Sequence, residues 1–171
     1  MGFSLYLYRH VAEAKIALTV RLSDKGCVMK NQDQVILHEI QKNTHMGMET
    51  IDALMPRIKD EDFAKELAKQ SMMYGQFYEK ATNELLKEDR RLYRDVTGTN
   101  MLLRGNIWVQ TFMDGSTSHM ARMVIEGAGR GITDICKVLN HNRHASGNIS
   151  AMARELMDKE EQTIGRLRDY L

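Results

Sequence analysis

The sequence predicts an all-α protein, a four-helix bundle made of two antiparallel helical hairpins. In four stretches, apolar residues recur at alternating steps of three and four, the period of a helix with one buried seam. After residue 10 there is no sustained alternation of apolar and polar residues, which a half-buried strand would show. The single proline in 171 residues is too few for a loop-rich β-sandwich or a proline-rich linker.

The first two helices are predicted over Gln32–Met55 and Glu61–Lys87. Pro56 ends or kinks the first helix, and Asp60 is the expected N-cap of the second, whose first turn is acidic. The predicted buried seams are Leu37, Ile40, Thr44, Gly47, Ile51, Leu54 and Ile58 in the first helix, and Phe63, Leu67, Gln70, Tyr74, Phe77, Ala81 and Leu85 in the second.

The third helix is predicted to be long, from about Asn100 or Asn106 to Leu139, and the fourth to run from a cap at Ser146 to the C-terminus. Cys136 is expected to be a small core residue near the end of the third helix. The predicted apolar faces include Val109, Met113, Ser116, Met120, Met123, Val124, Gly127, Gly131, Ile135 and Val138 in the third helix, and Ile149, Ala153, Leu156, Glu160, Ile164, Leu167 and Leu171 in the fourth.

Short connections within each pair of helices imply two antiparallel hairpins. The predicted connection between the hairpins has about a dozen residues, and an extended chain of that length covers roughly 40 Å. A helix of about 25 residues is roughly 38 Å long, so the connection can either cross the length of the bundle or make a simple up-down turn. The sequence leaves both topologies open.

The composition narrows the class of protein. Lys and Arg number 24 against 23 Asp and Glu, so no strong positive field marks a nucleic-acid partner. The two cysteines are far apart and form no disulfide framework, which favours a reducing, cytoplasmic location. No stretch is long and apolar enough to predict a membrane span.

The first 28 residues differ from the rest of the chain. They have neither the pattern of a signal peptide nor a single helical stripe. The codons of Lys25 and Gly26, AAR-GGN, form a purine tract like a bacterial ribosome-binding site, and Met29 follows at a suitable spacing. We therefore expect residues 1–28 to be an upstream extension of a bacterial protein, or else a disordered arm, and residues 29–171 to form the bundle domain.

Each predicted seam is interrupted near its middle by polar residues or glycine. Aligning the hairpins places Gly47 near Tyr74 and Gly127 near Glu160, where a glycine would make room for a bulky neighbour. Two interpretations follow: Glu160 either tilts toward solvent or is buried and accepts a hydrogen bond from the Tyr74 hydroxyl, because a buried carboxylate needs a partner. In the second case the expected structural polar layer consists of Thr44, Gln70, Tyr74 and Glu160.

Two helical hairpins with a carboxylate near the middle of the bundle resemble the ferritin-like superfamily, which includes rubrerythrin-type proteins and relatives in spore-forming bacteria. The resemblance covers about residues 31–171 and implies a four-helix bundle of that type. The family's metal pattern is a Glu on each of two helices and Glu-x-x-His on each of the other two. No Glu-x-x-His occurs in this sequence, so the usual ligand set is missing.

A non-standard metal shell is still an alternative. It would use Glu160, Glu126 and His119, with Tyr74 close by, and would take iron or manganese. His45 and Glu49, four residues apart, are a weaker pair that more resembles a solvated face. If Glu160 is buried with two or more other carboxylates or histidines, the sequence predicts a metal site, and if it is buried with Tyr74 it predicts a structural layer.

Three functions remain at this point. The first is a non-enzymatic ferritin-like bundle that acts through self-association, as a homodimer, or through contact with another protein, without a cofactor. The second is a divergent iron- or manganese-binding protein. The third is a small-ligand pocket near Gly47 and Gly127, which a core closed by Tyr74 and Met123 would count against.

Overall fold

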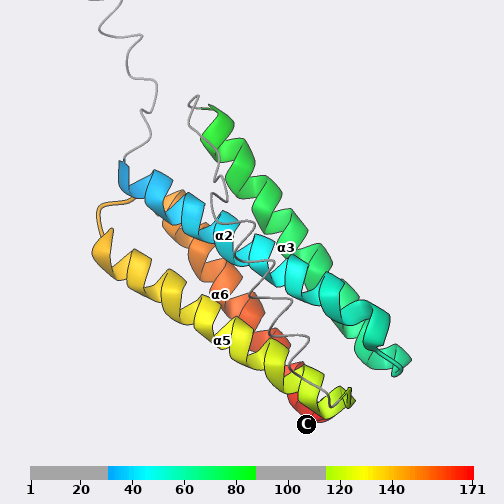
Figure 1. Cartoon of the computed structure of the whole chain (residues 1–171). Helices are drawn as coiled ribbons and strands as arrows, with labels where there is room; N and C mark the ends of the chain where they lie inside the picture. The colour runs from blue at the N-terminus through cyan, green and yellow to red at the C-terminus, as the bar shows by residue number, and fades with distance from the viewer. Residues whose placement is uncertain (1–30, 88–114) are drawn as a thin grey trace, which may run out of the picture.

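The computed structural model describes residues 31–87 and 115–171, and these are helical without a strand. Four helices pack side by side: α2 (Asn31–Leu54), α3 (Glu61–Lys87), α5 (Thr117–His141) and α6 (Gly147–Leu167) (Figure 1). Short 3₁₀ turns follow α2 at Met55–Arg57 and α6 at Arg168–Tyr170. The predicted all-α class and the packing of four helices are confirmed.

The first hairpin, formed by α2 and α3, agrees closely with the sequence prediction. The bounds of α3 are as predicted, and α2 ends one residue before Met55. Pro56 lies inside the 3₁₀ turn that separates the helices, since its missing N–H cannot continue an α-helix. Asp60 caps α3 through Oδ1, which accepts hydrogen bonds of 3.0 Å from the backbone N–H groups of Asp62 and Phe63.

The predicted start of the third helix is wrong within the described residues. Gly115 and Ser116 are not helical, and α5 begins at Thr117. Ser116 is exposed rather than part of the apolar face, and its side chain caps α5 by accepting a 3.3 Å hydrogen bond from the His119 backbone N–H. Serine competes for backbone hydrogen bonds and so favours caps over helix interiors. The predicted segment before residue 115 lies outside the described residues, as does the predicted extension over 1–28.

The second hairpin pairs α5 with α6. Ser146 is the N-cap residue of α6, as predicted, with extended backbone angles of −63° and 143°. Cys136 is exposed, which corrects its assignment to the core. Its neighbour Ile135 occupies the core position instead, because adjacent residues of a helix point about 100° apart.

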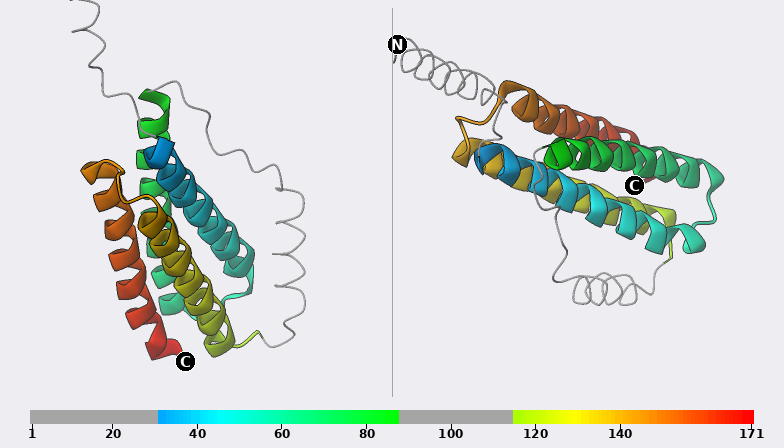
Figure 2. Two further views of the ribbon diagram at one scale, coloured as in Figure 1. Left: turned by 90° about the vertical axis from the view of Figure 1, so that its left-hand side faces the viewer. Right: turned by 90° about the horizontal axis from the view of Figure 1, so that it is seen from above.

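The ends of the two hairpins fix how the second follows the first. The end of α3 and the start of α5 lie at opposite ends of the bundle (Figures 1 and 2). This excludes the simple up-down turn that the sequence left open. α2 and α6 each contact all three other helices, whereas α3 and α5 make few or no contacts with each other.

A single apolar core runs between the helices. Its largest fully buried side chains come from all four: Phe63, Ile36, Leu37, Ile40, Ile51, Leu54, Leu67, Leu85, Ile135, Leu156 and Leu167. Most of the predicted seam positions of α2, α3 and α6 are among the buried residues. Within the described residues, none of the helices combines the length and the apolar character that crossing a bilayer would require.

Candidate functional site

A chain of three buried polar side chains connects α3 to α6. The Tyr74 hydroxyl donates to Oε2 of Glu160 at 3.0 Å, and Nε2 of Gln70 donates to the Tyr74 hydroxyl at 2.8 Å. A longer contact of 3.4 Å runs directly from Gln70 Nε2 to the same carboxylate oxygen. Glu160 is only 3% exposed and Gln70 only 1%. Of the two interpretations of Glu160, the structure therefore has the buried one, with the carboxylate held by Tyr74.

The ring of Tyr74 has room because Gly47 faces it from α2. A Cβ at Gly47 would lie 2.7 Å from Cζ and 2.8 Å from Cδ2 of Tyr74, closer than carbon atoms approach without a shift. The predicted proximity of Gly47 and Tyr74 is thus present. The ring fills the space above the glycine and Met123 is buried, which counts against a small-ligand pocket there.

The predicted role of Gly127 is wrong. Gly127 is exposed, and a Cβ there would meet no atom within 4 Å, so it does not make room for Glu160. Gly131, one turn later, is the glycine of α5 that allows a close approach. A Cβ there would lie 3.1 Å from Oδ1 of Asn43 on α2.

Thr44 is buried but does not join the polar chain. Its hydroxyl donates to the carbonyl oxygens of Ile40 at 2.7 Å and Gln41 at 3.2 Å, in its own helix. A threonine inside a helix commonly satisfies its hydroxyl in this way, and this removes it from the predicted layer. The neighbouring Gln41 instead reaches across to α3, donating from Nε2 to Oγ1 of Thr82 at 2.8 Å.

Burial governs the electrostatics of the polar chain. It raises the pKa of Glu160 from its ordinary value of 4.5 to about 7, although the hydrogen bonds from Tyr74 and Gln70 act to lower it. Burial also raises the pKa of the Tyr74 hydroxyl well above 10, with the adjacent carboxylate acting in the same direction. Tyr74 therefore remains a neutral donor at physiological pH, whereas Glu160 exchanges a proton near neutrality.

One atom of the Gln70–Tyr74–Glu160 polar chain lacks a hydrogen-bond partner. Oε1 of Gln70 is buried and accepts no hydrogen bond within the residues that the structure describes. A buried amide oxygen without a donor is unfavourable by about 1–3 kcal/mol. The amide is therefore held at one end only, through Nε2.

A second connection between α3 and α6 was not predicted. Glu66 accepts a hydrogen bond from Nε of Arg166, and Nη2 of Arg166 also donates to Thr163 at 3.0 Å. Partial burial acts to raise the pKa of Glu66, but the hydrogen bond from Arg166, with Lys69 beside it, lowers it below 4.5. Its signal in the sequence is the position of Glu66 three residues after Phe63 and four before Gln70, on the seam of α3.

A third unpredicted contact lies at the other end of the bundle. Asp33 of α2 is buried, and its two carboxylate oxygens accept hydrogen bonds of 2.6 Å from the backbone N–H and the hydroxyl of Ser146. The Ser146 side chain makes no cap bond within its own helix. Asp33 thus places a negative charge at the positive end of α6.

The residues considered as metal ligands do not come together. Glu160 lies in the polar chain, Glu126 is exposed on α5, and His119 is in the first turn of α5. Across 31–87 and 115–171, no group of three or more His, Cys, Asp or Glu side chains is placed to hold a metal ion. His45 Nε2 and Glu49 Oε1 lie 3.3 Å apart on α2, and both side chains are partly exposed.

The arrangement at mid-bundle is thus a buried carboxyl group that binds a proton near neutral pH and is joined to a neighbouring helix through a tyrosine and an amide. Gln70, Tyr74 and Glu160 of the predicted layer belong to it, and Thr44 does not. No protein-family model, no curated protein and no solved structure matches the chain significantly.

Proposed function

We propose that this chain is a ferritin-like helical bundle that acts through protein–protein contact, and that its first contact is with a second copy of itself. The ferritin-like assignment is supported by the order of the helices, since the first antiparallel hairpin ends and the second begins at opposite ends of the bundle, as is typical of that class. A buried carboxylate at mid-bundle, Glu160, adds to the resemblance.

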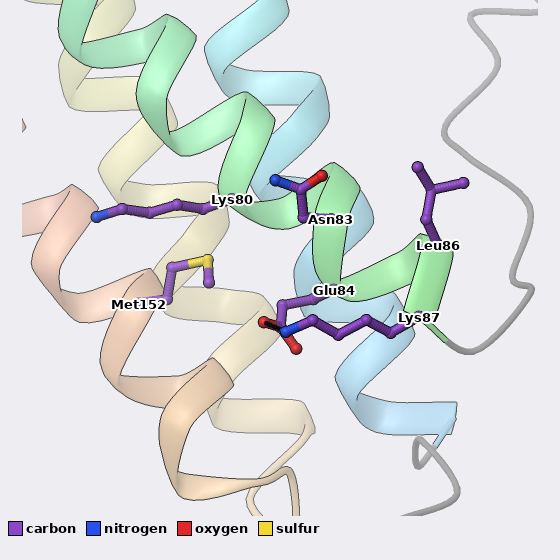
Figure 3. Close-up of a pocket in the computed structure, with 6 residues that line it drawn as sticks. All are labelled: Lys80, Asn83, Glu84, Leu86, Lys87 and Met152. Carbon is purple, nitrogen blue, oxygen red and sulfur yellow. Dashed lines mark hydrogen bonds and ion pairs between the residues drawn. The ribbon is translucent and has the colours of Figure 1, made fainter.

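The observation that carries the proposal is an open groove between α3 and α6. Most polar contacts between these helices, such as Glu66–Arg166 and Tyr74–Glu160, lie toward the start of α3. Toward its end, α3 leans away from α6 (Figure 2). The groove that this leaves has a volume of about 600 Å³ and is lined by Lys80, Asn83, Glu84, Leu86, Lys87 and Met152 (Figure 3).

The groove has two apolar side chains among four polar or charged ones. Leu86 is a large apolar side chain at its rim and is 55% exposed, while Met152 projects from α6 toward α3. Lys80 lies with its ammonium 4.8 Å from the ring centre of Phe77, so its aliphatic stem also covers apolar surface. Apolar side chains surrounded by charged groups are typical of an interface with another protein.

Sedimentation velocity of the full chain over a wide range of concentration tests the proposal. We expect reversible dimerisation that Leu86→Asp weakens at least tenfold, because it places a charge in the apolar part of the contact. Met72→Asp is the matched control, since Met72 is 69% exposed on the first half of α3, outside the groove. Circular dichroism confirms that both variants keep their helical content.

Three results would contradict the proposal. A wild-type chain that stays monomeric at all concentrations excludes self-association through the groove. Stoichiometric iron or manganese in protein purified without a His-tag, lost in Glu160→Ala, would instead favour the metal-binding alternative. Equal weakening by Leu86→Asp and Met72→Asp would place the contact elsewhere on the surface.

A further inference from the structure

We propose that Gln70, Tyr74 and Glu160 form a proton-responsive connection between α3 and α6, in which the direction of the hydrogen bonds reverses when the carboxylate takes up a proton. This goes beyond the proposed function and does not depend on it. It rests on the positions of three buried side chains and on the unpartnered oxygen of one of them.

In the ionised state every hydrogen bond points toward the charge. Nε2 of Gln70 donates to the Tyr74 hydroxyl, which donates to Oε2 of Glu160. An ionised carboxylate can only accept, so this direction is the one compatible with a charged Glu160. Hydrogen bonds to a charged acceptor are the stronger kind, and they hold the amide of Gln70 with its nitrogen toward Tyr74.

In the protonated state the same atoms allow the opposite direction. The neutral carboxyl group carries an O–H that can donate to the Tyr74 oxygen across the same 3.0 Å. The tyrosine hydroxyl is then free to donate to Gln70, whose amide turns over to present its oxygen at the 2.8 Å position. One proton enters at Glu160, the tyrosine proton changes its acceptor, and no bond to carbon changes.

Because Oε1 has no partner in the described part of the chain, turnover of the amide breaks no hydrogen bond of the oxygen. A glutamine amide that is bonded at both ends would lose bonds on turning over. Gln70 Oε1 has no partner among the described residues, so only the bonds of Nε2 must be replaced, and the reversed chain replaces the bond to Tyr74. The raised pKa of Glu160, about 7, places the change near neutral pH.

No charged side chain is among the causes of the raised pKa of Glu160, which are burial and the two hydrogen bonds. On the facing helix α3, the buried carboxylate of Glu66, one turn before Gln70, is engaged with Arg166 and Lys69. The other titratable or charged groups near Glu160, either in sequence or at the same height along the bundle, are exposed or partly exposed. They are Lys159 and Glu161 on α6, Glu126 on α5, and the His45–Glu49 pair on α2. The change is therefore assigned to the polar chain itself.

Nuclear magnetic resonance of the full chain, with labelled Glu carboxyl and Gln amide groups, tests the proposal across pH 5–9. We expect one carboxyl signal to titrate near pH 7 and to disappear in Glu160→Gln. The side-chain amide signals of Gln70 are expected to move with the same midpoint. In Glu161→Gln, the matched control on the exposed face of α6, both titrations are expected to persist.

A second variant separates this connection from simple burial of a carboxyl group. Tyr74→Phe removes the middle hydroxyl, so we expect the carboxyl midpoint to rise and the response of the Gln70 amide to diminish. The proposal is overturned if the Gln70 signals stay fixed while Glu160 titrates, or if no carboxyl group titrates near pH 7. The proposal is also overturned if added Mn²⁺ shifts the pH midpoint of the carboxyl titration and the shift is complete at one ion per chain, since the site would then bind metal.

Discussion

Asp33, near the start of α2, accepts two hydrogen bonds from Ser146, which lies 113 residues later in the chain. The contact joins the N-terminal turn of one hairpin to the cap of the last helix. Next to it, Oε1 of Gln32 accepts a 2.9 Å hydrogen bond from the backbone N–H of His144. These bonds fix the loop between α5 and α6 against the end of α2, at the end of the bundle opposite to the Glu66–Arg166 pair.

Asp33→Ala is expected to lower the free energy of unfolding by about 1–3 kcal/mol, because it leaves the part-buried N–H and hydroxyl of Ser146 without this acceptor and removes a favourable charge at a helix N-terminus. Urea denaturation followed by circular dichroism measures the change. Asn31→Ala, at an exposed position in the same turn, serves as the control. Equal effects of the two substitutions would show that the contact between Asp33 and Ser146 adds no stability.

Two glycines are expected to respond in opposite directions to alanine. Gly47→Ala drives a Cβ into the ring of Tyr74, and this overpacking is expected to destabilise the fold by about 1–3 kcal/mol. Gly127→Ala meets no atom and improves helix propensity, so it is expected to stabilise by up to about 1 kcal/mol. The melting temperatures of the two variants, each compared with the wild type, test this expectation. A lower melting temperature in Gly127→Ala would mean that the surroundings of Gly127 differ from those described.

The stability of the bundle is expected to depend on the charge of Glu160. The pKa of this group is about 7 in the folded chain and near 4.5 when it is exposed, so between these values the folded state holds more protons than the unfolded state. Its contribution is therefore complete below pH 4.5, declines as the pH rises to 7, and is lost above it. The difference between the two pKa values corresponds to about 3 kcal/mol at most.

Chemical denaturation at a series of pH values measures this dependence. Glu160→Gln keeps the shape of the protonated side chain without its titration, so the difference in stability between variant and wild type is expected to grow between pH 4.5 and 7. Glu161→Gln controls for the removal of a surface charge. Parallel profiles of wild type and Glu160→Gln would contradict the assignment.

The contact between Glu66 and Arg166 is expected to make stability depend on pH in a lower range than Glu160 does. The pKa of Glu66 is lowered in the folded chain, so its contribution is present above about pH 4.5 and lost as the pH falls through the folded value. Arg166 is half exposed, and we expect Arg166→Met to cost only about 1 kcal/mol at pH 7. We expect Arg166→Met to lose less stability than the wild type as the pH falls below 4.5, which denaturation at a series of pH values measures. The same fall in both proteins would argue against a contribution from the Glu66–Arg166 contact.

The helical period and the caps were sufficient to predict most of the first hairpin and much of the second. The bounds of α3 and the caps at Asp60 and Ser146 follow from local rules, because a helix start is set by residues within one turn. The start of α5 was missed because Ser116 falls on the apolar period of the third helix. Period alone cannot separate a cap from a core position.

The centre of the site was predictable in part. The alignment of antiparallel hairpins places Gly47 near Tyr74, since each hairpin has a short connection that fixes its register. Thr44 was wrongly included because a sequence does not show whether a hydroxyl bonds its own helix or a neighbour. The contact between Asp33 and Ser146 was missed because the hairpins meet at positions that the rotation of each helix decides, and that rotation depends on the packing of the whole core.

The order of folding follows from how far apart in sequence the contacting residues are. The contacts within each hairpin join residues that are close in sequence, and such contacts close with little loss of chain entropy. The hydrogen bonds of Glu160 to Gln70 and Tyr74 join residues 90 and 86 positions apart. We therefore expect each hairpin to form early and the polar chain to form late, so that substitutions at Tyr74 that only remove its hydroxyl accelerate unfolding and leave the refolding rate almost unchanged.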